Sequence, residues 1–309
     1  MRIAIIDLGT NTFNLLIADI KANKQYSIIF NDKTGVKLGK DGINKRIITP
    51  DAFQRALNGI AQHIKSINKF KAEKIVAIAT SGIRSTQNGD ELVSQIQKQF
   101  GVSVQIITGD KEAELIYRGV KQTIEFSIEN ILILDIGGGS NEFIIANKDG
   151  LQWKQSYNLG MARLLDKFNP SDPITTKEIE KVELYIDSKL KTLYNAVAIY
   201  KPTQLVGSSG TFDTIREMII ERKRLDKSHY ELHKSFPVEL DDYYLLHNAL
   251  IKSTSQERLI MKGLEFVRVE MIVLASIFVK FIVQKLNIKS ITQSSFALKE
   301  GMIDKIING

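Results

Sequence analysis

The sequence predicts an α/β protein that contains two copies of one folding unit. Two apolar strands each end in an acid and a run of small residues, "DLGTNT" at 7–12 and "DIGGGS" at 135–140, which is an offset of 128 residues. At the same offset Ser81-Gly82 aligns with Ser209-Gly210, and each pair follows a short apolar strand. Matching motifs at one fixed offset are typical of an internal repeat. Two such copies would place their loops face to face across a cleft, where a ligand would bind.

In the first copy, apolar strands alternate with helical patterns. A helix is expected from Thr49, which is suited to the N-cap, with Pro50 at the first helical position, to about residue 70. A second helix begins near Asp90 and can be terminated by Gly101, and a third opens near Gly109. The predicted strands are 2–7, 13–20, 26–30, 74–80 and 104–108, and a loop is expected at 81–84, directly after the fourth strand.

The second copy begins with the same hairpin and continues mainly as helix. Strands are expected at 131–135, 141–147, 151–157, 203–207 and 289–293. Helices are expected at roughly 176–200, 211–224, 241–252 and 265–286. We therefore expect two domains, 1–124 and 125–309, with a C-terminal helix that can pack back on the first domain.

The composition excludes several classes of protein. Hydrophobic residues make up 43% and charged residues 25% of the chain, which is ordinary for a soluble globular protein. The most apolar segment, 271–286, is interrupted by Lys280 and is shorter than the roughly 20 residues of a membrane span. The chain has no cysteine, which excludes disulfides and thiol chemistry and favours a cytoplasmic location.

The positive charge is concentrated in the first copy. The net charge is +7, and residues 1–124 carry 18 Lys and Arg against 11 Asp and Glu, whereas the two are equal at 24 in residues 125–309. An uneven basic charge indicates an anionic partner such as a nucleic acid, a polyphosphate or a nucleotide, unless it is only a solvated surface.

The two acid–glycine loops have the chemistry of a phosphate and metal site. Without a Cβ, glycine lets backbone N–H groups approach an anion and point at it. Hydroxyl groups of Thr10, Thr12 and Ser140 add donors. Asp7 and Asp135, at the strand ends, can hold a divalent cation, because Mg²⁺ commonly binds one or two carboxylates together with phosphate oxygens. A tight hairpin turn without any ligand would explain the same glycines.

Four further features are candidates for chemistry. Arg84, just after a strand, can clamp phosphate with its planar guanidinium, and the "GSSGT" loop at 207–211 offers amides at a helix N-terminus. Glu112, in a first helical turn, can accept a proton from water that attacks phosphorus. Glu142, on the same side of its strand as Ser140, is a second candidate metal ligand. The structural alternatives are a surface arginine, an N-cap, acids that complement a helix dipole and an exposed strand carboxylate.

No P-loop and no dinucleotide-binding glycine motif is present in the sequence. Instead, seven short motifs occur in one order along the chain: "DLGTNTFNLLI", "ATSGIR", "GDKEAELIYRGV", "DIGGGSNEF", "NLGMARL", "GSSGT" and "SSFALKEGMI". As a set they resemble the exopolyphosphatase and guanosine pentaphosphate phosphohydrolase (Ppx/GppA) family. The resemblance extends from residue 3 to about residue 303, and it is the order of the motifs that makes it specific.

The resemblance implies a fold and a set of site residues. The fold would be two duplicated actin-like (RNase H-like) domains with the site in the central cleft between them. Glu112 would be the general base, Arg84 would be a catalytic residue that grips phosphate, and Asp7, Asp135 and Glu142 would hold Mg²⁺ or another divalent cation. The residues that would bind phosphate are Gly9, Thr10, Asn11, Thr12, Ser81, Gly137, Gly138, Gly139, Ser140, Gly207, Ser208, Ser209, Gly210 and Thr211.

The chain departs from the family pattern in three places. Asn14 stands where the family usually has a basic residue, which puts one phosphate contact in doubt. Ser208 and Ser209 replace parts of a more glycine-rich loop. With 309 residues, the chain looks like the short, two-domain form of the family.

The resemblance implies hydrolysis of terminal phosphate from inorganic polyphosphate, which the basic first half favours over the alternative, 5′-phosphate removal from pppGpp. A small-molecule kinase of the same fold and a non-catalytic sensor of polyphosphate or guanosine penta- and tetraphosphate are further alternatives. We expect neither a nucleic-acid partner nor a membrane. The sequence leaves the oligomeric state open, a homodimer included.

Overall fold

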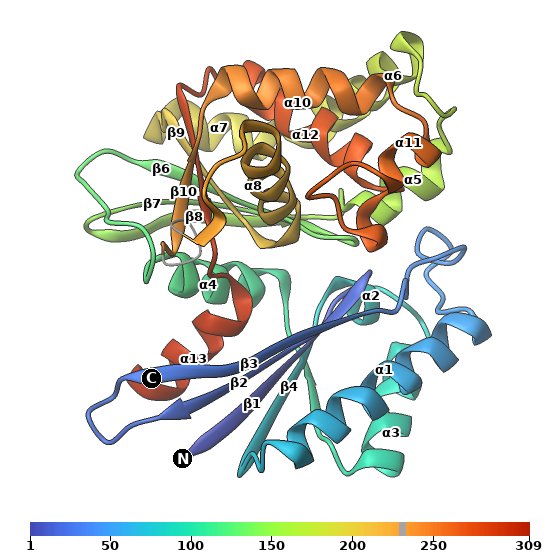
Figure 1. The fold of residues 1–309 in the computed structure, drawn as a ribbon, viewed down its shortest axis with the longest axis vertical. Helices are drawn as coiled ribbons and strands as arrows, with labels where there is room; N and C mark the ends of the chain where they lie inside the picture. Colours follow the sequence, from blue (N-terminus) through green and yellow to red (C-terminus); the bar gives the residue numbers. More distant parts are fainter. Residues whose placement is uncertain (229–232) are drawn as a thin grey trace.

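The computed structural model describes residues 1–228 and 233–309, which form two mixed β-sheets with helices on their faces (Figure 1). The first sheet has the strand order β3-β2-β1-β4-β5. Its strands are β1 (Arg2–Leu8), β2 (Thr12–Ile20), β3 (Tyr26–Gly35), β4 (Lys74–Ala79) and β5 (Val104–Ile106). The second sheet has the order β10-β11-β9-β6-β7-β8. Its strands are β6 (Ile131–Ile136), β7 (Asn141–Asn147), β8 (Gly150–Tyr157), β9 (Gln204–Ser208), β10 (Ser235–Val238) and β11 (Ser290–Ser294).

The two sheets repeat one topology. In the first, β1, β2 and β3 form an antiparallel meander, and β4 and β5 then add in parallel beside β1. In the second, β6, β7 and β8 form the same meander, and β9 and β11 add in parallel beside β6. Within residues 1–228 and 233–309, only β10, which pairs antiparallel with β11, extends the second sheet beyond the first. This repetition confirms the predicted α/β fold of two duplicated actin-like units.

In the first lobe, which is the five-stranded sheet with α1–α3, the two longer helices begin where the sequence predicts. Helix α1 (Pro50–Lys69) is capped by the hydroxyl of Thr49, and α3 (Gly89–Phe100) ends at Gly101, which is left-handed with φ of 68°. The expected loop at 81–84 was wrong, because these residues form a one-turn helix, α2 (Ser81–Arg84). The turn closes because the amide of Arg84 donates to the carbonyl of Thr80 at 2.9 Å.

In the second lobe, which is the six-stranded sheet with α5–α8 and α10–α12, two predicted helices have other bounds, and the helices at 161–168 and 255–259 and the strand β10 were not predicted. The predicted helix at 176–200 is interrupted at Leu190, and the predicted helix at 265–286 begins only at Ile272. The preceding segment, 260–271, contains no α-helix and only a 3₁₀ turn at Phe266–Arg268. The helices are α5 (Met161–Phe168), α6 (Thr176–Lys189), α7 (Lys191–Tyr200), α8 (Ser209–Lys223), α10 (Leu240–Lys252), α11 (Ser255–Leu259) and α12 (Ile272–Lys285).

Two further helices lie between the lobes (Figure 1). Helix α4 (Gly109–Val120) packs against β7, β8 and the C-terminal helix α13 (Leu298–Asn308), which in turn packs against β1. Gly119 and Gly301 allow the close approach of the two helices, because a Cβ on Gly301 would lie 1.7 Å from the carbonyl oxygen of Leu115. Apolar residues of β1, β2, β6, β7, α4 and α13 form one buried cluster, which joins the two sheets. In the described part of the chain, no helix has the length and apolarity that crossing a membrane requires.

Candidate functional site

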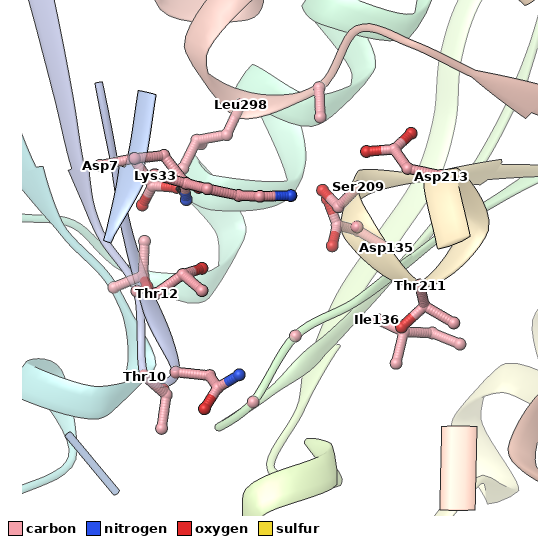
Figure 2. Close-up of a pocket in the computed structure, with 18 of the residues that line it drawn as sticks. Asp7, Thr10, Thr12, Lys33, Asp135, Ile136, Ser209, Thr211, Asp213 and Leu298 are labelled. Atoms are coloured by element: carbon pink, nitrogen blue, oxygen red, sulfur yellow. Dashed lines mark hydrogen bonds between the residues drawn. The ribbon is translucent and has the colours of Figure 1, made fainter. Parts of the chain in front are cut away.

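A pocket of about 550 Å³ opens between the two lobes, where the strand-end loops of both copies meet (Figure 2). Its wall is formed by the loop after β1, the loop after β6, the first turn of α8 and the start of α4. The predicted site residues on this wall are Asp7, Gly9, Thr10, Asn11, Thr12, Ser81, Glu112, Asp135, Gly137, Gly138, Gly139, Ser140, Glu142, Ser209, Gly210 and Thr211. Residues between positions 7 and 211, from both copies, therefore converge on one site.

The two acid–glycine loops have the same geometry. In the first, the amide of Gly9 donates to the carbonyl of Thr12 at 3.1 Å, and in the second the amide of Gly137 donates to the carbonyl of Ser140 at 3.0 Å. The loops also approach each other, since a Cβ on Gly139 would lie 2.5 Å from the hydroxyl of Thr10. The missing side chains therefore allow close contact between the copies as well as leaving backbone amides open.

Asp135 is buried and bonded to the first turn of α8. Its Oδ2 accepts hydrogen bonds from Ser209 Oγ at 2.5 Å and Ser208 Oγ at 3.3 Å. Burial and the nearby carboxylate of Glu142 raise the pKa of Asp135 to about 8, against the smaller opposing effect of the serine hydroxyls. Ser209 has a φ of 64°, a left-handed conformation that non-glycine residues rarely adopt and that clusters at functional sites. The strained residue is thus the one that holds the carboxylate.

Asp7 occupies the equivalent place in the first copy but has a different partner. It lies opposite Asn14 in the sheet, just as Asp135 lies opposite Glu142. Asn14 Nδ2 donates to Asp7 Oδ2 at 2.9 Å, while Oδ1 of Asp7 is buried and has no hydrogen-bond partner among the described residues. Burial raises the pKa of Asp7 to about 6. Asn14 therefore orients this carboxylate and leaves one oxygen available.

Glu112 and Glu142 are two buried carboxylates of the pocket wall. Burial and the charge of Glu142 raise the pKa of Glu112 well above 4.5, although Arg84 opposes the shift. Arg84 Nη1 donates to Glu112 Oε2 at 2.8 Å and to the carbonyl of Ile107 at 2.9 Å. Glu142 accepts hydrogen bonds from the hydroxyls of Ser140 and Ser156 at 2.7 and 2.6 Å. Glu112 is therefore held at a fixed position with an elevated pKa.

Three of the predicted residues do not reach the pocket wall. Arg84 lies behind Glu112. Gly207 lies in β9 under the ring of Phe212, where a Cβ would come within 2.0 Å of a ring carbon, so its small size serves packing. Ser208 is fully buried, and its hydroxyl reaches only Asp135 among the described residues. Arg84 and Ser208 thus support the wall residues rather than line the pocket.

The pocket also contains residues that the sequence analysis did not single out. Lys33, Asp213, Arg268 and Lys299 line it, and they come from β3, α8, the 260–271 segment and α13. Burial raises the pKa of Asp213 to about 6, although Arg268, Gln293 and both lysines oppose the shift. Lys299 was within a quoted motif, "SSFALKEGMI", but the other three are outside every motif. Only tertiary structure brings them to the site.

The donor set of the pocket suits a hard cation only in part. Its carboxylates are oxygen ligands of the kind that Mg²⁺ prefers, and Asp7 has an oxygen without a partner. Yet within residues 1–228 and 233–309 no group of three or more His, Cys, Asp or Glu side chains is arranged to hold a metal ion by itself. Any cation here would need ligands from elsewhere, such as phosphate oxygens and water.

The family of the chain follows from comparison with known proteins. The model of the Ppx/GppA phosphatase family matches residues 16–308. The chain belongs to this family. The Ppx/GppA assignment confirms the predicted family. It also confirms the prediction that the chain belongs to a family of exopolyphosphatase-type enzymes.

Relatives within the Ppx/GppA family agree with this assignment. A bifunctional 3-dehydroquinate synthase/phosphatase from Fusobacterium nucleatum is 30% identical over 90% of the chain, which spans only 42% of that relative's length. Exopolyphosphatase 1 from Mycobacterium leprae is 24% identical over 98% of the chain and 88% of the relative.

Solved structures of similar proteins have the same fold. An exopolyphosphatase from Cytophaga hutchinsonii, whose crystal structure is known, has 39% sequence identity to this chain. The two structures superpose with a TM-score of 0.96 over 100% of this chain and 98% of that one. A family member from Aquifex aeolicus is 22% identical, with a TM-score of 0.78 over 99% and 97% of the two chains, and it supports the fold alone.

Proposed function

We propose that this Ppx/GppA protein is an exopolyphosphatase that releases terminal phosphate from inorganic polyphosphate by attack of water. The observation that carries the proposal is the buried Glu112 carboxylate in the wall of a pocket that both acid–glycine loops line. We further propose that the two actin-like domains span 1–124 and 125–309. The exopolyphosphatase names of two relatives in different genera support the choice of substrate.

The two loops are suited to bind the terminal phosphate. Backbone amides of Gly138 and Gly139, with the hydroxyls of Thr10 and Ser81, would donate to its oxygens. The hydroxyl of Ser81 is buried and has no hydrogen-bond partner within the described residues, so it is a donor in need of an acceptor. Donors that are fixed before substrate arrives can stabilise charge that develops on the phosphoryl group without reorganisation.

Glu112 is placed to act as the base. Its elevated pKa makes it a better proton acceptor than an ordinary carboxylate, while Arg84 limits the rise and keeps the group ionisable. The hydrogen bond from Arg84 also fixes the direction in which the carboxylate faces. In the proposed reaction Glu112 takes the proton of a water molecule as its oxygen bonds to the terminal phosphorus. The bond from that phosphorus to the bridging oxygen breaks, and the bridging oxygen stays with the shortened chain.

Asp7, Asp135 and Glu142 are the residues that would hold a divalent cation. Burial raises the pKa of all three carboxylates, and the charges of Glu142 and Asp7 raise the pKa of Asp135 further. Keeping these groups ionised in the pocket therefore costs free energy, and a bound cation would offset that cost. The incomplete ligand set agrees with a cation, such as Mg²⁺, that is completed by substrate phosphate and water. When bound, such a cation would neutralise negative charge on the phosphate oxygens. Ser208 and Ser209 orient Asp135 for this task.

A pppGpp 5′-phosphohydrolase is the second candidate, because part of the pocket wall is formed by residues outside the phosphate loops. Met271, Ile272 and Ala275 provide an apolar wall there, and Asp213 offers an acceptor for the N–H or O–H groups of a nucleoside. The reaction at phosphorus would be the same in both cases.

A comparison of substrates tests the proposal. With Mg²⁺, the purified protein is expected to release phosphate from long and short polyphosphate with a higher kcat/KM than from pppGpp, and to release little from ATP. A higher kcat/KM for pppGpp would replace polyphosphate by the nucleotide as the substrate. Binding of polyphosphate without any phosphate release would favour the sensor, and phosphate transfer from ATP to a small acceptor would favour the kinase.

A further inference from the structure

We propose that Lys33 is a substrate-binding residue for a phosphate group behind the terminal one, and that Glu265 competes with the substrate for it. This inference rests on the proposed function, because it assigns a further phosphate contact to the same pocket. It makes the 260–271 segment part of substrate selection.

The position of Lys33 follows from the register of the first sheet. Asp7 lies opposite Asn14 on β2, and Asn14 lies opposite Lys33 on β3, so the three side chains share one face of the sheet. The equivalent row of the second sheet reads Asp135, Glu142 and Ser156, and there the hydroxyl of the third residue donates to the carboxylate of the second. Lys33 lines the pocket and Ser156 bonds the pocket residue Glu142, so the third position of the row lies next to the site in both copies.

Lys33 extends into the pocket from the side of Asp7. Figure 2 shows its amine pointing across the pocket toward Ser209 and Asp213 on the opposite lobe. Asn14, which is neutral and is bonded to Asp7, provides no charge on this side. Lys33 is therefore the positive end of the row, two strands away from β1, the strand that leads into the phosphate loop.

The ammonium group of Lys33 is engaged by a carboxylate of the other lobe. Glu265 Oε1 accepts its hydrogen bond, and the other oxygen of Glu265 lies 3.5 Å from Nε of Arg268, a second cation of the pocket wall. No hydrogen-bond acceptor is found for this buried Nε in the part of the chain that the structure describes. Glu265 thus lies between two cations of the pocket wall, Lys33 and Arg268.

The ion pair of Lys33 and Glu265 is suited to exchange. The side chains are 45% and 41% exposed, and an ion pair at this exposure contributes little to stability. A phosphate group carries more charge and more acceptor oxygens than a carboxylate, so it can displace Glu265 from the lysine. The competition favours polyanions over singly charged ligands.

The 260–271 segment has a second, similar contact that provides a control. Lys37 Nζ bonds Glu270 Oε2 at 2.8 Å, also between the first lobe and this segment. Neither Lys37 nor Glu270 lines the pocket. Loss of either ion pair should loosen the segment to a similar degree, but only the pair of Lys33 and Glu265 should alter phosphate binding.

Calorimetric binding of tripolyphosphate, in a Glu112→Gln background that prevents turnover, tests the inference. Lys33→Gln is expected to weaken binding about tenfold or more, since a hydrogen bond to a charged group is lost. Glu265→Gln is expected to tighten binding by about threefold, because the competing anion is removed. Glu270→Gln and Lys37→Gln should leave the Kd within about twofold of the background, because the loss of an exposed ion pair outside the pocket changes free energies only slightly.

Two outcomes would overturn the inference. The first is unchanged binding in Lys33→Gln when its melting temperature matches the parent. The second is equal tightening by Glu265→Gln and Glu270→Gln, which would mean that the segment acts by mobility alone. Failure of the proposed function would look different: the wild type would release no phosphate, whatever these dissociation constants are.

Discussion

Replacement of Glu112 by glutamine is expected to lower kcat for phosphate release from polyphosphate by about 100- to 10,000-fold, the usual contribution of a positioned base. Glutamine has nearly the same shape and can remain beside Arg84, but it cannot accept the proton from water. Binding should persist, so KM should change much less than kcat. Steady-state phosphate release at saturating polyphosphate measures the effect.

Glu114→Gln is the matched control for this substitution. Glu114 is on the same helix, but it pairs with Lys111 and Arg118 and does not line the pocket. The pH profile is an independent check, because the base must be ionised. The acid limb of kcat/KM should have its midpoint well above 4.5, since burial raises the pKa of Glu112. Equal rates for Glu112→Gln and Glu114→Gln would contradict the role of Glu112.

Replacement of Asp135 by asparagine should abolish most of the divalent-dependent activity and yet increase stability at alkaline pH. The variant keeps an acceptor for Ser209 but loses the negative charge that would face the cation. We expect a fall in activity of about 100-fold or more, because a metal ion contributes several kcal/mol of charge stabilisation. Titration of activity with Mg²⁺ measures it, and the exposed Asp149→Asn serves as the control.

The stability effect of this substitution follows from proton linkage. The pKa of Asp135 rises from 3.8 to about 8 on folding, so between these values the folded protein binds more protons than the unfolded chain. Its contribution to stability is therefore complete at low pH and is lost as the pH rises toward 8. With a chelator present, the melting temperature of Asp135→Asn should exceed that of the wild type most clearly near pH 8. A variant that is less stable there, with an unchanged response to Mg²⁺, would contradict this account.

The sequence contained enough local information to predict the fold and most of the pocket. The repeated motifs predicted equivalent hairpins, and the turn at Gly9 matches the turn at Gly137 in its hydrogen bond. A glycine-rich turn between two strands has few alternative structures, which is why such short motifs are reliable. The helix caps at Thr49 and Gly101 are local signals of the same kind.

The residues that sequence did not reveal depend on tertiary contacts. Lys33 is a polar residue of an edge strand, like many others. Arg268 lies in a segment that was predicted as the start of the helix at 265–286, because apolar residues follow it. Gly207 was predicted to bind phosphate, yet it lies against Phe212, because a glycine needed for packing looks the same in sequence as one needed for a ligand. These residues come together only because the two lobes pack against each other, and no single sequence motif encodes that packing.

The central claim is that water attacks the terminal phosphorus of polyphosphate. Phosphate release in water enriched in ¹⁸O, followed by mass spectrometry of both products, tests it most directly. The account predicts one solvent oxygen in each released orthophosphate and none in the shortened chain. Solvent oxygen in the new chain end with unlabelled orthophosphate, or no release of phosphate at all, would contradict it.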